Sequence, residues 1–133
     1  MGHIDPFILQ LTAEEPVLQW YGLTIVEAHD GVATVTLTVT PAQLNGNRMA
    51  HGGIAFAVAD QAFAMAANTV LHYAATVDAG IQYLAPTRAG DVLTARARTT
   101  YHDGKRAVVD VEVSADDRIV ALFRGTARAA RRG

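Results

Sequence analysis

A long apolar stretch from Gly53 to Leu71 limits the folds open to this chain more than any other part of its sequence. It is rich in alanine, phenylalanine, methionine and valine and contains no helix-breaking residue after its first position. The stretch predicts a helix that is apolar on nearly every side, and such a helix must be covered by protein. Because Asp60, Gln61 and Asn68 interrupt it, no run of about 18 apolar residues occurs and a membrane span is not expected.

The cover is expected to come from strands. Apolar residues alternate with polar ones at the period of two that half-buried strands show, in residues 23–28, 32–40, 77–83, 93–97, 107–113 and 121–127. Between these segments lie residue pairs typical of tight turns, namely Asp30-Gly31, Gly90-Asp91, Asp103-Gly104 and Asp116-Asp117. We therefore expect consecutive strands to pair antiparallel, in the order β-β-α-β-β-β-β.

Residues 6–20 follow neither pattern, because apolar residues there mix with Glu14 and Glu15, and Pro16 follows directly. We expect one or two short helical turns that act as a strap or lid. With 133 residues, half of them hydrophobic and 18% charged, the chain has room for one core. Residues 1–133 are therefore predicted to form a single domain of the α+β class, an antiparallel sheet of about six strands curled around one central helix.

Composition excludes several classes of protein. The net charge of −2 provides no basic field for nucleic acid. The chain has no cysteine, which rules out disulfides and thiolate metal sites, and His3, His29, His72 and His102 show no metal-ligand spacing, so no metal is predicted. Since residues 1–10 lack the basic and apolar runs of a signal peptide, we expect a cytoplasmic protein.

The apolar helix also predicts a second chain. One helix and six strands hide little apolar area unless the sheet curls around the helix, and one side of the helix then stays uncovered. A second copy would cover that side. We therefore expect a homodimer or a dimer of dimers.

The chemistry is expected where this helix begins. His51-Gly52-Gly53 precedes the apolar stretch, and two glycines let the backbone approach a ligand closely. Free N–H groups and the helix dipole favour developing negative charge at this end, so the segment predicts an oxyanion-type site. Asp60 follows in the most apolar part of the chain, where a carboxylate is costly unless it is paired or functional.

Gly53 and Asp60 are seven residues apart, so they share a helix face but lie about 10 Å apart along its axis. One chain cannot easily bring both to a single carbonyl group. Two antiparallel helices from two copies would place the Asp60 carboxylate of one opposite the Gly53 amide of the other. The active site is therefore predicted to lie at the subunit interface.

The chain resembles the hotdog-fold acyl-CoA thioesterases of the PaaI type, which are named for phenylacetate breakdown. The resemblance spans nearly the whole chain and rests on Leu44-Asn45-Gly46, on His51-Gly52-Gly53 at its spacing from Asp60, and on residues 83–87 followed by Gly90-Asp91. It implies a curled sheet around a central helix in a dimer, commonly a tetramer. It also implies hydrolysis of a small aryl-acyl or medium-chain acyl-CoA to a free acid and CoA, with no cofactor beyond the coenzyme A of the substrate.

The resemblance implies a role for each matching residue. Asp60 would activate water or attack the thioester itself, and the Gly53 amide would polarise the carbonyl. His51 would orient the loop and the thiolate side, Asn45 would hold the water or the carbonyl, and Thr76 would assist the water. A thioester suits these groups, because its thiolate leaves without a strong general acid.

Further residues are candidates for substrate binding. Gly52 and Gln61 flank the reacting groups. Lys105 and Arg106 are candidate cations for the phosphates of coenzyme A, with Arg88 a weaker one.

Four residues depart from the family. Asn47, Arg48 and Met49 stand where members often have histidine, glycine or small residues, and Gln61 stands where threonine or serine is frequent. These departures bear on the acyl preference and leave the reacting groups unchanged.

Simpler interpretations stay open. His51 alone fits a loop histidine bonded to backbone, Asp60 fits a structural acid paired with an arginine across a dimer seam, and Asn45 fits a turn. Lys105 and Arg106 fit ordinary hairpin charges. Two other functions also stay open, an enoyl-thioester hydratase or dehydratase on the same fold and an acyl-CoA binding module without catalysis.

Overall fold

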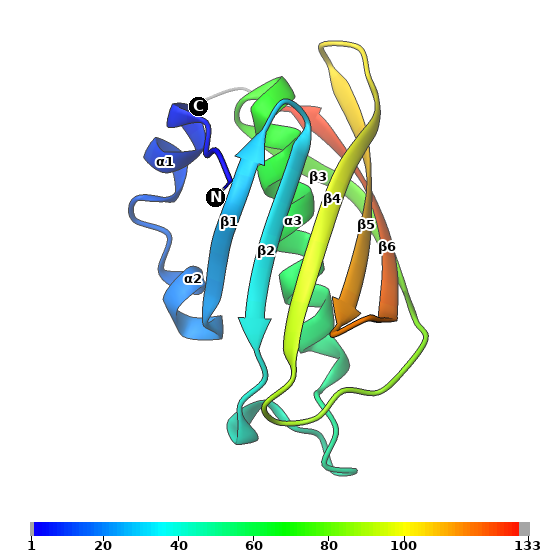
Figure 1. Ribbon diagram of the computed structural model, residues 1–133. Coiled ribbons are helices and arrows are strands. Elements are labelled where there is room, and N and C mark those ends of the chain that lie inside the picture. Colours follow the sequence, from blue (N-terminus) through cyan, green and yellow to red (C-terminus); the bar gives the residue numbers. More distant parts are fainter. Residues whose placement is uncertain (1, 131–133) are drawn as a thin grey trace.

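The computed structural model describes residues 2–130, which form a sheet, a long helix and a short helical N-terminal segment (Figure 1). The elements are α1 (Pro6–Thr12), α2 (Pro16–Tyr21), β1 (Leu23–His29), β2 (Val32–Thr38), the 3-10 helix η1 (Pro41–Gln43), α3 (Gly52–Leu71), β3 (Ala74–Tyr83), β4 (Val92–His102), β5 (Arg106–Ala115) and β6 (Arg118–Ala129). The predicted order of strands and central helix is confirmed. The predicted domain also included Met1 and residues 131–133, which lie outside the described residues.

The strands form an antiparallel sheet in the order β1-β2-β4-β5-β6-β3. Three of the four expected hairpins join neighbouring strands of this sheet, those at Asp30-Gly31, Asp103-Gly104 and Asp116-Asp117. Asp30 and Gly31 both have positive φ, 49° and 82°, as the tight turns of hairpins require.

The hairpin expected at Gly90-Asp91 is wrong. β3 pairs with β6 at one edge of the sheet, and β4 pairs with β2 instead. Gly90 does turn the chain, with a φ of 93°, but residues 84–91 cross the end of the sheet between strands that are not neighbours. A pair of turn residues indicates only that the chain changes direction there, and does not determine which strands lie side by side. Here α3 moves the chain across the sheet before β3 begins, so β3 pairs with β6 and not with β4.

The core lies between α3 and the inner face of the sheet. Val58, Ala62 and Ala66 of the helix are fully buried, and apolar residues of all six strands pack around the helix. The contribution of β3 is the partly buried pair Ala74 and Ile81. A Cβ atom on Gly125 of β6 would lie 2.7 Å from the Phe63 ring, so only glycine lets the helix approach this strand so closely. The predicted α+β architecture is therefore observed, with the helix inside the curve of the sheet (Figure 1).

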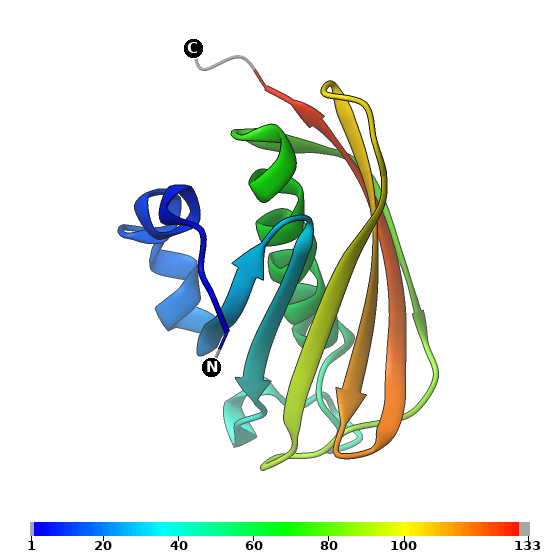
Figure 2. The same ribbon diagram turned by 45° about the horizontal axis from the view of Figure 1, so that its top comes forward.

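The N-terminal helices α1 and α2 form the expected strap. Asp5 caps α1 by accepting a hydrogen bond from the Phe7 backbone N–H, and Ile8 is fully buried. The Phe7 ring stacks on His72 at the far end of α3, with ring centroids 4.0 Å apart. Figure 2 shows the strap on the β1 side of the molecule, away from β3.

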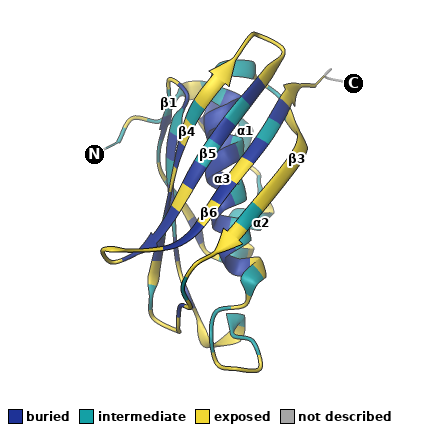
Figure 3. Ribbon diagram, turned by 90° about the vertical axis from the view of Figure 1, so that its right-hand side faces the viewer, coloured by how far each residue is buried: buried dark blue, intermediate teal, exposed yellow. Residues whose placement is uncertain are grey.

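One side of the central helix and one edge of the sheet are less covered. Phe56, Ala57, Asp60 and Ala64 are only half-buried, and β3 is exposed along most of its length (Figure 3). By length and hydropathy α3 could cross a membrane, but 61% of the window concerned is buried inside the protein, as in any apolar core helix. We predicted from the sequence that one side of this helix stays uncovered in a single chain, and the half-buried side of α3 fits that description.

Candidate active site

The N-terminus of α3 is organised by His51. The Gly53 backbone N–H donates a hydrogen bond to the His51 Nδ1, with 2.9 Å between the nitrogens, so the imidazole is the N-cap of the helix. The His51 backbone N–H in turn donates to the Gln43 carbonyl oxygen at 2.9 Å. The amide expected to polarise a substrate carbonyl is thus bonded to the imidazole in this structure. To serve a substrate it must be released by a rotation of the His51 side chain or shared between two acceptors.

Both glycines of the His-Gly-Gly segment lie against side chains. A Cβ on Gly52 would come within 3.1 Å of the Tyr83 hydroxyl oxygen, and a Cβ on Gly53 within 3.2 Å of the His51 Nδ1. The Tyr83 hydroxyl donates to the Gly52 carbonyl oxygen at 2.8 Å. The predicted close approach at this helix start is therefore made first by the protein's own side chains.

Asn45 lies in the loop before α3 and organises that loop. Its Oδ1 accepts hydrogen bonds from the backbone N–H groups of Asn47 at 2.8 Å and Met49 at 3.2 Å, and Arg48 between them has a positive φ of 61°. The simpler interpretation of a turn residue is therefore observed. The Asn45 Nδ2 makes no hydrogen bond within residues 2–130 and is left as a donor for a ligand.

Asp60 is a half-buried carboxylate with no hydrogen bond or ion pair among the described residues. Burial raises the pKa of its carboxyl group above the ordinary aspartate value. No arginine among residues 2–130 neutralises it. A carboxyl group of this kind holds its proton more strongly than a surface aspartate and is a better base when ionised.

A small cavity of about 160 Å³ lies beside Asp60, between α3 and the strap. Its lining consists of Val17, Tyr21, Leu23, Gly53, Phe56, Ala57, Asp60 and Gln61. Gly53 and Asp60 thus border one cavity from two positions along the helix, as their shared face predicts. Most of the other lining residues are apolar, which suits an acyl group.

Two residues near Asp60 were given no catalytic role by the sequence. Gln61 is 7% exposed, and its Nε2 is buried without a hydrogen-bond partner among residues 2–130. Burial raises the pKa of Glu15, the Gln61 side chain beside it lowers that pKa, and the charge of Asp60 raises it further, so the net shift is upward. Nothing in the sequence distinguishes Glu15 from its neighbour Glu14, and only the docking of the strap brings it here.

A larger cavity of about 670 Å³ opens on the other side of the helix start. The Gln43 Nε2 donates to the Tyr21 carbonyl oxygen at 3.1 Å and so ties the strap to η1 across this cavity. Trp20, which is 77% exposed, stands at its edge. The lining combines strap, η1 and helix start, namely Gln19, Trp20, Tyr21, Gly22, Thr40, Ala42, Gln43, Leu44, His51, Gly53 and Ile54.

The remaining predicted residues lie elsewhere in the chain. Thr76 is exposed on the edge strand β3, at an irregularity of its pairing with β6. Arg88 follows β3, and its backbone N–H donates to the Asp91 Oδ2 at 2.9 Å. Lys105 and Arg106 form the β4–β5 turn, where both backbone N–H groups donate to the Asp103 carboxylate.

Lys105 and Arg106 do not meet the helix start within one chain. The Lys105 carbonyl oxygen accepts a hydrogen bond from the Ala129 N–H, and Ala129 pairs with Ala74, directly after the C-terminal end of α3. A helix of 20 residues spans about 30 Å, so this turn lies at the opposite end of the molecule from His51 (Figure 1). These cations can reach a substrate at the helix start only from another chain.

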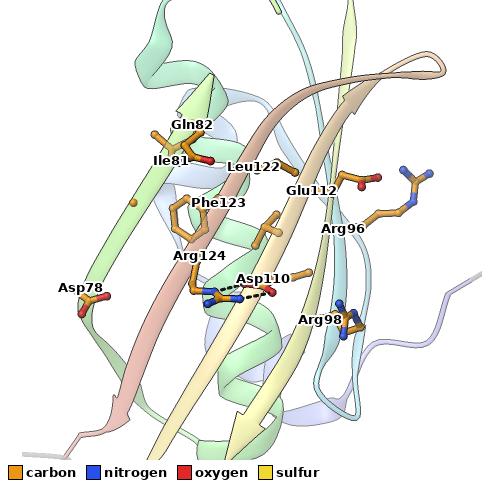
Figure 4. Close-up of a pocket in the computed structure, with 13 residues that line it drawn as sticks. Asp78, Ile81, Gln82, Arg96, Arg98, Asp110, Glu112, Leu122, Phe123 and Arg124 are labelled. Carbon is orange, nitrogen blue, oxygen red and sulfur yellow. Dashed lines mark hydrogen bonds and ion pairs between the residues drawn. The ribbon is translucent and has the colours of Figure 1, made fainter. Parts of the chain in front are cut away.

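A hollow of about 960 Å³ lies over β3 to β6 and contains none of the predicted site residues (Figure 4). Two of its charged residues form an ion pair. Arg124 donates to both oxygens of Asp110, and these hydrogen bonds lower the pKa of Asp110 and raise that of Arg124. Within residues 2–130 no group of three or more histidine, aspartate and glutamate side chains is placed to hold a metal ion.

Comparison with known proteins decides the family. The model of the thioesterase superfamily matches residues 47–122, which include His51, Gly53 and Asp60. The chain belongs to the thioesterase superfamily. Its resemblance to the PaaI type is confirmed by the acyl-coenzyme A thioesterase PaaI of Escherichia coli K12, which is 42% identical over 105 residues, 78% of this chain and 75% of the relative.

Solved thioesterase structures share the fold. The structure of the E. coli PaaI protein from the phenylacetic acid degradation operon superposes with a TM-score of 0.87 and covers 94% of both chains at 34% identity. A hypothetical thioesterase protein from Streptococcus pneumoniae TIGR4, solved with coenzyme A, has a TM-score of 0.76 at 27% identity, and the match covers 81% of this chain and 88% of that one. The predicted hotdog fold and the predicted enzyme class are therefore confirmed.

Proposed function

We propose that this thioesterase hydrolyses a small aryl-acyl or medium-chain acyl-CoA to the free acid and CoA. The observation that carries the proposal is the unpaired, half-buried Asp60, whose pKa is raised by burial, on the same helix face as the Gly53 amide. The name of the E. coli relative and the coenzyme A in the S. pneumoniae structure support coenzyme A as the thiol part of the substrate.

Asp60 would act in one of two ways. As a general base it removes a proton from water, the resulting hydroxide attacks the carbonyl carbon, and the carbon–sulfur bond breaks to release the thiolate. As a nucleophile it displaces the thiolate directly to form an anhydride, which water then cleaves. Both routes end with one acid and one thiol and need no metal or further cofactor.

The carbonyl oxygen would be stabilised at the start of α3. The Gly53 N–H, once His51 releases it, and the free Asn45 Nδ2 are the donors available for the developing negative charge. His51 would stay on the side of the site from which the thiolate leaves. Thr76 of a neighbouring chain would assist the attacking water. These roles follow the matching motif positions and await mutation.

A second copy would complete the site. The exposed edge of β3 and the half-buried side of α3 are the surfaces for it, and an antiparallel arrangement of two helices would bring Asp60 of one chain to Gly53 of the other. The same arrangement would bring the Lys105–Arg106 turn of one chain toward the helix start of the other, where these cations and Arg88 would meet the phosphates of coenzyme A. We propose a homotetramer built from two such dimers, located in the cytoplasm.

The test is release of free thiol from a panel of acyl-CoAs by the parent protein and by Asp60→Asn. We expect a rate loss on the order of 100-fold or more in the variant, because the base or nucleophile is removed. Asp117→Asn, an exposed acid in the β5–β6 turn, is the matched control and should match the parent.

A parent that binds acyl-CoA without releasing thiol would refute the proposal and favour a binding module. A change in enoyl absorbance without thiol release would instead favour a hydratase. An Asp60→Asn variant as fast as the parent would remove Asp60 from the mechanism.

A further inference from the structure

Gln61 has an unexplained buried donor. Its Nε2 lies in the wall of the Asp60 cavity, the residue is 7% exposed, and no acceptor among residues 2–130 reaches the nitrogen with hydrogen-bond geometry. Leaving a buried donor unpaired costs about 1–3 kcal/mol. A buried donor without a partner at a candidate site calls for an explanation, and an acceptor that arrives during function supplies one.

The strap carries a carboxylate beside Gln61. Glu15 occupies the N-cap position of α2, but its side chain does not cap that helix. Glu15 is half-buried whereas Glu14 is exposed, and its carboxyl group lies against Gln61 and close enough to Asp60 for their charges to repel. The Glu15 side chain is therefore directed toward α3 rather than toward its own helix.

The strap that carries Glu15 also covers the cavity. Val17 and Tyr21 of α2 form one wall, and Asp60 and Gln61 form part of the opposite wall. A small inward movement of α2 would narrow the cavity and shorten the distance between Glu15 and Gln61 at once.

We propose that Glu15 is a positioning residue for the proposed thioesterase reaction. Its carboxylate accepts a hydrogen bond from the Gln61 Nε2 when the strap closes on a bound acyl group, which fixes Gln61 and places a second negative charge beside Asp60. The proposal rests on the proposed function of Asp60.

Two effects follow. The hydrogen bond orders the cavity wall that Asp60 belongs to, and the added charge makes Asp60 a stronger base, because a nearby carboxylate disfavours a second one. The two carboxyl groups therefore titrate as a pair in two steps. Glu15 lies outside the cavity lining, and the titratable groups among the lining residues are Asp60 and Tyr21 of α2. The other lining residues are Val17, Leu23, Gly53, Phe56, Ala57 and Gln61.

The experiment is the pH dependence of kcat and kcat/KM for thiol release. Glu15→Gln removes the negative charge, so the acidic limb of kcat/KM should move to lower pH. Because this variant keeps an oxygen acceptor for Gln61, its kcat should fall less than the kcat of Glu15→Ala. Glu15→Ala should show the same displacement and lower kcat by about tenfold, the size expected for one lost hydrogen bond to a charged group. Gln61→Leu should lower kcat without moving the limb.

Glu14→Gln removes an exposed charge from the same segment and is the matched control, with a profile like that of the parent. Thermal unfolding of every variant identifies any loss of fold. A fall in kcat for Glu15→Ala with an unmoved acidic limb would show that Glu15 only anchors the strap and would overturn the proposal, as would superimposable profiles. If Asp60→Asn stays active the proposed function fails, whereas an inactive Asp60→Asn with unmoved Glu15 profiles defeats this inference alone.

Discussion

Replacing His51 by alanine tests whether the imidazole holds the N-terminus of the central helix. His51 accepts a hydrogen bond from the Gly53 N–H at 2.9 Å, and alanine has no acceptor to replace it. Loss of a side-chain N-cap costs about 1 kcal/mol in the free energy of unfolding. The backbone hydrogen bond from His51 to Gln43 does not involve the side chain and should survive.

The assay is urea unfolding at a fixed protomer concentration, since association of chains would otherwise change the apparent stability. With a denaturant dependence of about 2 kcal/mol per molar, the midpoint should fall by roughly half a molar. Hydrogen exchange of the Gly53 amide, followed by NMR, should become severalfold faster, because that N–H loses its acceptor. His102→Ala, an exposed histidine on β4, is the matched control and should change neither quantity.

The reasoning would be refuted if His51→Ala unfolded at the parent's midpoint and its Gly53 amide exchanged at the parent's rate. The cap would then be absent in solution, and the Gly53 amide would be free for a carbonyl at all times. The mechanism would in that case need no movement of the imidazole.

Three further results are expected. Asp60→Asn should raise the melting temperature at neutral pH even though we expect it to slow thiol release. With a folded-state pKa above the unfolded one, the carboxyl group lowers stability as pH rises through that interval, so the gain should vanish in acid below both values. Gly125→Ala should cost about 1–3 kcal/mol of unfolding free energy, because the new methyl group meets the Phe63 ring at 2.7 Å, and Phe63→Leu in the same chain should recover part of it. Alanine at both Lys105 and Arg106 should raise KM for an acyl-CoA by about tenfold and leave KM for the matching acyl-pantetheine unchanged; equal effects on both substrates would remove these residues from phosphate binding.

Sequence periodicity was sufficient for the elements of this fold because period is a local property. The apolar stretch beginning at Gly53 predicted a covered helix, and the alternating segments predicted strands, although the strand at 77–83, expected to be half-buried, is mostly exposed as part of β3. The pairing of strands is not local. Gly90-Asp91 has the same appearance as the three true hairpin turns, and only the passage of α3 across the sheet places β3 beside β6.

The candidate site divides in the same way. The spacing from His51-Gly52-Gly53 to Asp60 is determined by the sequence, since a helix converts the seven residues from Gly53 to Asp60 into a shared face. This spacing indicated the family together with Leu44-Asn45-Gly46 and with residues 83–87 followed by Gly90-Asp91. The structure shows that the Gly53 amide is bonded to the imidazole two residues earlier, a local contact that the motif spacing does not indicate. The tertiary structure alone decided that Glu15 rather than Glu14 lies beside Asp60, and that the Lys105 turn lies at the opposite end of α3. These two placements involve segments far apart in the chain, and they depend on how the strap and the sheet pack around the helix.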